Sequence, residues 1–448
     1  MEFKKITVGN FAENLDRFRI PLSSAEREKK RGKYPYYGAA KIIDYVDGFT
    51  HSGLSVLIAE DGSVETDKGY PVVQLANGEY WVNNHTHVLK GKNDWDTLYL
   101  YYALQIIKVS PFVTGAVQKK ISQKALNSME LNYFEDPMIR RKIVESLLEL
   151  DKKIELNTQI NQTLEQIAQT IFKSWFIDFD PVHTKANALA SGQTLEQATQ
   201  AAMSVISGKN TQELHRLQTA NPEQYQQLWE IAEAFPRGFD EEGVPWGWDS
   251  KKVGEVAKIV KGKSYKSSEL APSKTALVTL KSFNRGGGYR LDGLKEYTGN
   301  YKEEQEVFAG DLIIAYTDVT QAADVIGKPA MVMSDSCYEH LVISLDVGVV
   351  RPKNEKHKYF LYCLAMTDTF QAHTHSFCTG TTVLHLGKDA VPSFEFILPD
   401  NKFIELFDEF VLPIFVRINN IIEENKSLEK IRDELLPKLL SGEILNGN

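Results

Sequence analysis

The chain has 448 residues, of which 42% are hydrophobic and 25% are charged, which suits a globular protein with more than one core. Its net charge of −9, taken as a whole, argues against a nucleic-acid partner. The sequence has no apolar run long enough to span a bilayer, no signal peptide, and three cysteines without CxxC spacing. We therefore expect a cytoplasmic chain without a membrane segment, a disulfide or a cysteine-based metal site.

The segment 1–136 is predicted to form a mixed α/β domain. A β-rich run at 55–59 is bounded by Gly and Asp, as is typical of a short strand. Apolar residues at helical spacing predict a helix over 96–107, which Asp96 can cap. A polar turn that begins at Thr114-Gly115 precedes the last strand of the domain.

A long amphipathic helix is predicted over 137–180, and Pro137 occupies a favoured position in its first turn. Its apolar residues alternate in steps of four and three, the pattern of a coiled-coil seam. The apolar pattern ends near Trp175, about 58 Å from Pro137 at about 1.5 Å per residue, and we expect Pro181 to stop the helix. This length favours a spacer or assembly arm. The seam residues are Ile143, Leu147, Leu150, Ile154, Asn157, Asn161 and Leu164.

The second half of the chain repeats the first. The segment 181–245 is predicted to be a linker with a helical insertion, and 246–400 repeats short runs of the first domain in the same order. The segment 401–448 repeats the long helix with an offset of 264, so that Asn425 corresponds to Asn161. Its seam residues are Ile414, Ile418, Ile421, Asn425, Leu428 and Leu435. Matched periodicity and matched text predict an internal duplication; the alternative is two unrelated surface helices with apolar stripes.

No catalytic constellation is recognisable in the sequence. Gly262-Lys263-Ser264 resembles the end of a phosphate-binding loop, but position 257 is alanine where that loop needs glycine. The alternating pairs His85/His87 and His373/His375 are expected in strands or loops and lack a Cys or carboxylate partner at metal spacing. The sequence also lacks the Asn-Pro-Pro-aromatic motif of adenine methyltransferases. We therefore expect no catalytic residue, no metal and no cofactor.

Basic residues nevertheless concentrate near the start of each domain. The segment 17–41 holds eight basic and two acidic residues, and 249–290 holds ten and three. Cations interleaved with aromatic side chains and a glycine-rich loop suit phosphate and base contacts; the alternative is a set of solvated loops. The candidate DNA-binding residues are Lys29, Lys30, Arg31, Lys33, Tyr36, Gln118, Lys119, Lys120, Lys261, Lys263, Lys266, Arg285, Tyr289 and Arg290.

The repeated plan resembles the specificity (S) subunit of type I restriction–modification systems. The run Phe172-Lys-Ser-Trp-Phe-Ile-Asp-Phe-Asp-Pro-Val182 follows the first helix, and Leu436-Pro-Lys-Leu-Leu-Ser-Gly-Glu-Ile444 follows the second. The resemblance implies an α+β fold, in which two pseudo-repeated α/β target recognition domains are separated by two long helices that form an antiparallel coiled coil. It covers essentially the whole chain; one departure is 183–235, which looks longer and more helical than the usual link.

The resemblance also implies function and partners. Each domain would read one half of a split sequence in double-stranded DNA, and the helices would set the spacing. Two methylation subunits would dock on the helices and use S-adenosylmethionine, and restriction subunits would use ATP, so that this chain itself needs no cofactor. Ile160, Ile167, Phe172 and Phe176 lie off the seam and are predicted to face partner subunits, with packing against the domains as the alternative.

Two other functions stay open on the sequence. One is a single-chain nuclease or methyltransferase with an unrecognised site, which would require a cofactor motif that the sequence does not display. The other is an assembly scaffold whose basic segments are solvated surface. Salt-dependent binding of duplex DNA would separate the scaffold from a specificity subunit.

Overall fold

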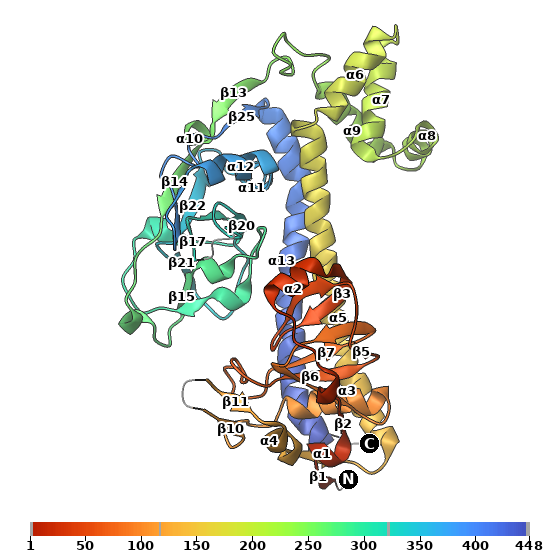
Figure 1. Ribbon diagram of the computed structural model, residues 1–448. Helices are drawn as coiled ribbons and strands as arrows, with labels where there is room; N and C mark the ends of the chain where they lie inside the picture. The colour runs from red at the N-terminus through yellow and green to blue at the C-terminus, as the bar shows by residue number, and fades with distance from the viewer. Residues whose placement is uncertain (1–2, 116–117, 320–322, 445–448) are drawn as a thin grey trace. The chain divides into compact units, whose positions relative to one another are not determined.

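The computed structural model describes residues 3–115, 118–319 and 323–444 (Figure 1). The chain divides into two compact units, residues 1–156 with 425–448 (unit 1) and residues 157–424 (unit 2). The two long helices predicted from the seam are α5, Pro137–Phe176, and α13, Asn401–Leu440, and each contributes residues to both units. Each unit therefore combines part of both long helices with one domain of mixed helices and strands, which confirms the predicted α+β class.

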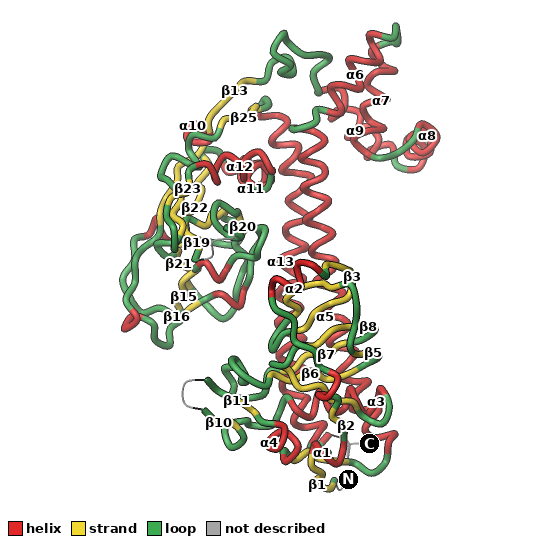
Figure 2. Tube along the Cα trace, in the orientation of Figure 1, coloured by secondary structure: helices red, strands yellow, loops and turns green. Residues whose placement is uncertain are grey.

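The domain of unit 1 is built on two four-stranded sheets with strand orders β2-β9-β6-β7 and β4-β3-β8-β5 (Figures 1 and 2). Its strands are β1 Lys4–Thr7, β2 Glu13–Asn14, β3 Arg31–Tyr37, β4 Ile42–Val46, β5 His51–Ser52, β6 Ser55–Ala59, β7 Val73–Ala76, β8 Glu79–Val82, β9 Thr86–Lys90, β10 Val113–Thr114, β11 Lys120–Ile121 and β12 Glu130–Tyr133. Its helices are α1 Val8–Phe11, the 3-10 turn η1 Asp16–Phe18, α2 Ser24–Lys29, α3 Asp94–Leu104 and α4 Gln123–Ser128.

The domain of unit 2 has sheets of order β14-β22-β18-β20 and β16-β15-β21-β17. Its strands are β13 Asp249–Lys252, β14 Ala257–Lys261, β15 Thr275–Val278, β16 Lys295–Glu296, β17 Glu306–Val307, β18 Leu312–Ala315, β19 Thr317–Asp318, β20 Pro329–Met331, β21 His340–Ile343, β22 Val347–Pro352, β23 Cys378–Thr379, β24 Leu384–Leu386 and β25 Glu395–Leu398. Its helices are α10 Val253–Val256, α11 Lys358–Ala365 and α12 Asp368–Ser376, with 3-10 turns η2 Ser267–Glu269, η3 Leu280–Ser282, η4 Leu291–Gly293, η5 Glu303–Gln305 and η6 Glu355–His357.

The two domains share one topology. Strand β3 pairs parallel with β8 and antiparallel with β4, and β15 pairs parallel with β21 and antiparallel with β16. In each domain the first strand also pairs antiparallel with the last, β1 with β12 and β13 with β25. The order and strand directions of both four-stranded sheets agree between the domains, whereas among the described residues the small sheet has two strands in the first domain, β10-β11, and three in the second, β19-β24-β23. The shared four-stranded sheets confirm the predicted internal duplication.

The predicted cap of helix α3 is wrong by one turn. The side chain of Asn93 accepts the amide of Asp96 at 3.0 Å and caps the helix. Asp96 is instead buried, and one of its carboxylate oxygens lies 2.9 Å from the guanidinium of Arg140 on α5. A burial of this kind is decided by tertiary packing, which the local capping pattern does not report.

The long helices pair antiparallel in both units, and all the predicted seam residues are buried or partly buried. In unit 2, Nδ2 of Asn161 donates to the carbonyl of Ile418 at 3.4 Å. In unit 1, Nδ2 of Asn425 donates to the carbonyl of Ile154 at 3.4 Å. Donor and acceptor of the two bonds are related by the 264-residue offset, so each unit holds the same asparagine contact across the seam. An asparagine in a seam specifies register, because a slipped pairing loses its partner.

Each domain packs onto the long helices through a tyrosine-rich helix. In unit 1 the Tyr102 hydroxyl on α3 donates to Asp151 of α5 at 2.6 Å, and Arg432 of α13 lies 2.9 Å from the same carboxylate. In unit 2 the Tyr362 hydroxyl on α11 donates to Glu165 of α5, and the ring of Tyr359 stacks on Phe415 of α13. Both helices are therefore tied to the domain within each unit.

The predicted partner-facing role of Phe172 and Phe176 is wrong. Both side chains are buried in the core of unit 2, where their rings contact Phe360 of α11 and Phe407 of α13. Of the other two residues outside the seam, Ile160 is half-buried and Ile167 is 43% exposed. The second domain therefore covers the phenylalanine side of α5, as the alternative prediction had it.

Residues 180–234 form four helices with an apolar core of their own. They are α6 Asp180–Ala190, α7 Leu195–Ser207, α8 Thr211–Ala220 and α9 Pro222–Ala234. Pro181 starts α6 in place of ending α5, because Phe179 at φ 52° already turns the chain. The buried ammonium of Lys185 donates to the carbonyls of Ala232, Glu233 and Phe235, where α9 ends. A cation at a helix C-terminus satisfies carbonyls that have no partner within the helix.

Replacing Glu165 by Gln is expected to change the pH dependence of stability. Burial raises the pKa of Glu165, and the hydrogen bond from Tyr362 opposes this shift only in part. Above about pH 4.5, the ordinary value, the folded chain holds more protons than the unfolded chain, so the wild-type unfolding free energy falls as pH rises. Urea unfolding measures the free energy of unfolding of both proteins. We expect the value for Glu165→Gln minus the value for the wild type to rise between about pH 5 and 8. A constant difference across this pH range would contradict the assignment.

Replacing Lys185 by Met is expected to destabilise the four-helix insertion by about 2–4 kcal/mol, because three carbonyls lose a charged donor. Urea unfolding followed by tryptophan fluorescence measures the effect. Arg216→Met, at an exposed site on α8, is the matched control and should lie within about 0.5 kcal/mol of wild type. Equal midpoints for the Lys185 and Arg216 variants would show that the three hydrogen bonds add nothing.

Candidate nucleic-acid interface

Helix α2 delivers the first basic segment to the edge of a sheet. Ser23 caps α2 through a capping box with Glu26, and the helix ends at Lys29, directly before strand β3. Arg27 holds α2 against β4, with its Nε 3.0 Å from the carboxylate of Asp44. Lys29, Lys30, Arg31 and Lys33 then follow one another on the exposed start of the β3–β4 ribbon, which comprises Arg31–Tyr37 and Ile42–Val46.

The fold uses the side chains of two aromatic candidates for packing. Tyr36 is 1% exposed, and its hydroxyl accepts the amide of Leu22 at 2.9 Å. Tyr289 is half-buried against the core of the second domain, and burial raises the pKa of its hydroxyl. Tyr36 and Tyr37 are both buried at a register shift of β3, so period-2 alternation does not separate buried from exposed tyrosines here.

Several candidate cations already have partners. Lys30 lies 3.7 Å from Asp47, Lys120 3.0 Å from Glu60, and Lys119 forms an ion pair with Glu65. In the second domain Arg285 lies 3.5 Å from Asp324, Nε of Arg290 donates to Asp292 at 2.9 Å, and Lys263 donates to the carbonyl of Asn300. A phosphate would have to compete with these contacts. Lys29, Arg31 and Lys266 are exposed and form no ion pair with any residue that the structure describes, so they are the strongest candidates for phosphate contact.

The other candidates are placed as follows. Lys33 and Lys261 are exposed, and their ammonium groups lie 5.1 Å and 4.5 Å from the ring centres of Tyr34 and Tyr316. Gln118 and Lys266 are exposed. Gly262 is buried where an added Cβ would lie 2.1 Å from the carbonyl oxygen of Ser344, so strand packing explains this glycine and a phosphate loop does not.

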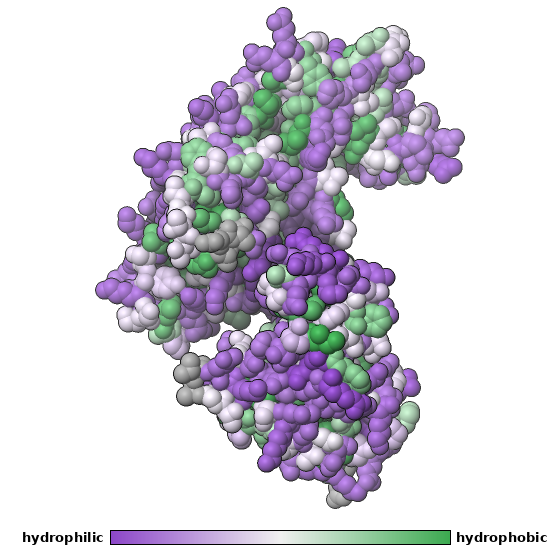
Figure 3. All heavy atoms as spheres, in the orientation of Figure 1, coloured by the Kyte–Doolittle hydropathy of each residue, from purple (hydrophilic) through white to green (hydrophobic). Residues whose placement is uncertain are grey.

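Sequence reasoning missed a set of exposed apolar side chains beside the first basic segment. Their exposed fractions range from 38% to 52%, while hydrophilic residues cover most of the face shown in Figure 3. They are Phe18, Ile20, Ile42, Ile43, Tyr45 and Phe49. Residues 42–46, Ile-Ile-Asp-Tyr-Val, are mostly apolar and β-rich, which is typical of a strand whose apolar side chains are covered, so the pattern did not predict that they would be exposed.

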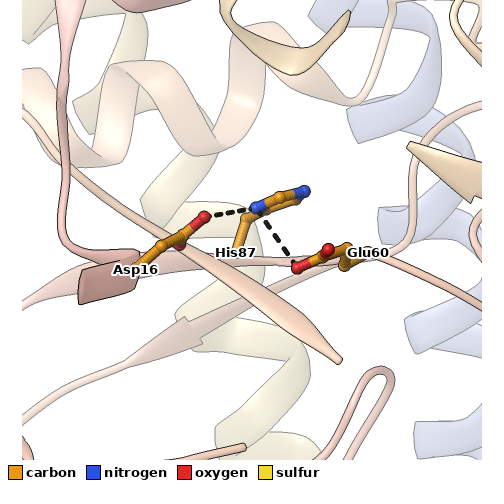
Figure 4. Close-up of side chains that lie close together, drawn as sticks. All are labelled: Asp16, Glu60 and His87. Atoms are coloured by element: carbon orange, nitrogen blue, oxygen red, sulfur yellow. Dashed lines mark hydrogen bonds and ion pairs between the residues drawn. The ribbon is translucent and has the colours of Figure 1, made fainter. Parts of the chain in front are cut away.

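A polar cluster of the first domain forms where Asp16, Glu60 and the buried His87 converge from η1, the end of β6 and β9 (Figure 4). Nδ1 of His87 lies 2.6 Å from Asp16 and 3.7 Å from Glu60, and Nε2 lies 2.8 Å from the carbonyl of Ile121. Burial by itself would raise the pKa of Asp16, but hydrogen bonding to His87 and nearby charge leave it lowered. The carboxylate partners of His87 are distant in sequence, so spacing could not reveal them.

The cluster is an ion-pair network in which Arg19 and Lys120 already supply positive charge to the two carboxylates. Arg19 lies 2.6 Å from Glu60 and 3.5 Å from Asp16, and Lys120 lies 3.0 Å from Glu60. A divalent ion would have to displace these charges, so the residues present fit a structural network better than a metal site. The network joins η1, β6, β9 and β11, and so braces the segment that leads to α2.

The histidine pair at 373 and 375 has a different setting from the one expected. Both residues lie on helix α12, not in a strand or loop. Nε2 of His373 lies 3.1 Å from the hydroxyl of Ser393, and its ring contacts Phe394, whereas His375 is exposed. His373 is therefore a packing residue, and His375 is a solvent-exposed one.

Comparison with known proteins agrees with this architecture. The family model of the type I restriction modification DNA specificity domain matches residues 1–166 and 245–423. The chain belongs to the family of type I specificity subunits. The matched ranges leave out 167–244, which contain all four helices of the insertion. The departure noted in the sequence therefore lies between the two matched ranges.

Two relatives extend over most of this specificity subunit. The specificity subunit of the type I restriction enzyme HindI from Haemophilus influenzae is 34% identical over 338 residues, 72% of this chain and 71% of that protein. The MjaIX specificity subunit from Methanocaldococcus jannaschii is 25% identical over 77% of this chain and 68% of that protein. The crystal structure of an S subunit from M. genitalium aligns with 98% of this chain and 96% of that one, at 15% identity and a TM-score of 0.47. None of the helices among the described residues is long and apolar enough to cross a membrane.

Replacing Lys29 and Arg31 together by Ala is expected to weaken binding to duplex DNA of every sequence. Two lost phosphate contacts should lower the steepness of log affinity against log salt by about 2. Fluorescence anisotropy of the assembled complex at several salt concentrations measures the slope. Replacing Lys4 and Lys68 by Ala removes the same charge from unit 1 at residues paired with Glu135 and Asp433, and should leave the slope unchanged. If both variants had the same slope of log affinity against log salt, Lys29 and Arg31 would not be phosphate contacts.

Proposed function

We propose that this specificity subunit recognises a split, asymmetric DNA sequence, with one half read by each α/β domain. One observation carries the proposal. The two domains repeat one arrangement of two four-stranded sheets, yet matching strands carry different side chains: β3 reads Arg-Gly-Lys-Tyr-Pro-Tyr-Tyr and β15 reads Thr-Ala-Leu-Val. Equal scaffolds with unequal surfaces suit two related but different half-sites.

The long helices suit the spacer role in this proposal. A rigid helix pair turns helix length into a distance between half-sites, in the way that dimer geometry does for other DNA readers. The paired asparagines support a single register of that pair, and a single register means a single spacing. Exposed apolar residues on the helices, among them Leu156 and Val416 at 51% and 49%, offer surface for partner subunits.

We further propose that the chain acts without chemistry of its own. Methylation subunits, two in number, would dock on it and transfer methyl groups from S-adenosylmethionine, and restriction subunits would supply ATP-driven cleavage. The chain would need no cofactor and would work in the cytoplasm, where its DNA lies. The polar cluster around His87 supports this assignment, because its cationic positions are already filled.

Modified-base sequencing tests the proposal. A host without adenine methylation would carry this chain with its methylation partner, or the partner alone. We expect methyladenine at one split, asymmetric motif only when the chain is present. The same methylation pattern in both hosts would show that specificity does not reside in this chain. Co-purification of the two proteins establishes assembly in the same cells.

A further inference from the structure

The β3–β4 ribbon has one covered face and one bare face. On β4 the side chains alternate: Asp44 is held by Arg27 of α2, and Val46 is fully buried. Tyr45 lies between these two residues and so points to the opposite face, where it is 52% exposed. Ile43, which the register skips at a β-bulge, is 42% exposed. Pro35 of β3 lies opposite Tyr45 in the register. Helix α2 therefore covers one side only.

The ribbon ends in a tight loop that brings Ile43 to its tip. The amide of Gly38 donates to the carbonyl of Lys41 at 2.8 Å and closes the turn between β3 and β4. A Cβ built at Gly38 would lie 3.0 Å from Cγ2 of Ile43, so the side chain of Ile43 lies against this turn. The tip therefore presents an apolar side chain on a short, closed hairpin.

The surroundings of this bare face suit a polyanion. Lys29, Lys30, Arg31, Lys33 and Lys41 are all exposed on α2, the ribbon and its turn. Lysine is depleted in the core of protein–protein interfaces, where its desolvation is unfavourable. An apolar strip flanked by lysines instead matches duplex DNA, which offers phosphates on both sides of a groove and base edges at its floor.

The side chains of Ile43 and Tyr45, called the apolar strip from here on, limit which features of a base pair this surface can recognise. The major groove is about 12 Å wide and admits a two-stranded β-ribbon. An isoleucine side chain has no hydrogen-bonding group, and the 5-methyl group of thymine is the apolar feature that base pairs display in this groove. Ile43 and the ring of Tyr45 are therefore suited to contact with thymine.

We propose that the β3–β4 ribbon is the element of the first domain that enters the major groove, and that Ile43 and Tyr45 recognise thymine through its 5-methyl group. This inference rests on the proposed function, because it assumes that the first domain reads DNA. It assigns phosphate contact to Lys29 and Arg31 and base selection to the apolar strip.

Replacing thymine by deoxyuridine removes the methyl group and keeps the base pair, which tests the inference directly. Each thymine of the target, as defined by methylation sequencing, is replaced singly in a duplex, and binding of the assembled complex is measured by competition. We expect the wild type to lose about fourfold in affinity at a position under the strip, the value of one methyl contact. Ile43→Ala or Tyr45→Ala should bind the thymine and deoxyuridine duplexes equally at that position.

The control variant is Ile177→Ala in unit 2, the same substitution at a residue of similar exposure, 38%. It should keep the full wild-type response to deoxyuridine. A wild type that selects its target over a scrambled duplex, yet is insensitive to deoxyuridine everywhere, would overturn the ribbon inference and leave the proposed function intact. A wild type without any preference for the target would overturn both.

Two further outcomes also decide against the ribbon. Ile43→Ala and Tyr45→Ala variants that still respond to deoxyuridine like the wild type would show that the methyl group is read elsewhere. Variants that fold, by circular dichroism, but no longer co-purify with the methylation subunit would make the strip a protein-docking surface. The deoxyuridine scan of the wild type needs no variant, so misfolding of a variant cannot hide the answer.

Discussion

Burial of the apolar stripe shared by α5 and α13 is the constraint on which both units depend. A long helix with one apolar face is stable in water mainly through what covers that face. Here the cover is the other long helix, and Asn161 and Asn425 each donate across the seam to an isoleucine carbonyl. A slipped pairing would bury both amides without these partners, so the seam favours one register.

Each domain packs against the paired long helices. Tyr102 on α3 and Tyr362 on α11 each donate a hydroxyl hydrogen bond to a carboxylate on α5. Around that shared anchor the sheets keep one topology, while their exposed residues differ. The duplicated part of the sequence thus preserves packing, and the differences collect where side chains meet solvent, which is where recognition of different ligands requires them.

In the first domain, residues of the same type differ in exposure and in their ion-pair partners, because the packing around them differs. Tyr36 and Tyr45 belong to neighbouring strands, yet one is buried under Leu22 and the other is half exposed. Lys29 and Lys120 are both exposed, yet only Lys120 has its charge matched by a carboxylate, that of Glu60. Composition and charge runs identify the region where DNA is expected, but the partners of each side chain determine which of them can contact it.

The sequence by itself determined the long helices, their seam, the duplication and the family, because helical periodicity and repeated text are local and survive in one dimension. Only the tertiary structure decided that Phe172 and Phe176 pack inward, that Asp96 binds Arg140 in place of capping α3, and that Ile43 and Tyr45 stay bare. Alternation of side chains along a strand predicts that the strand has two faces. Which face is covered depends on residues far away in the sequence, so the local pattern does not determine it.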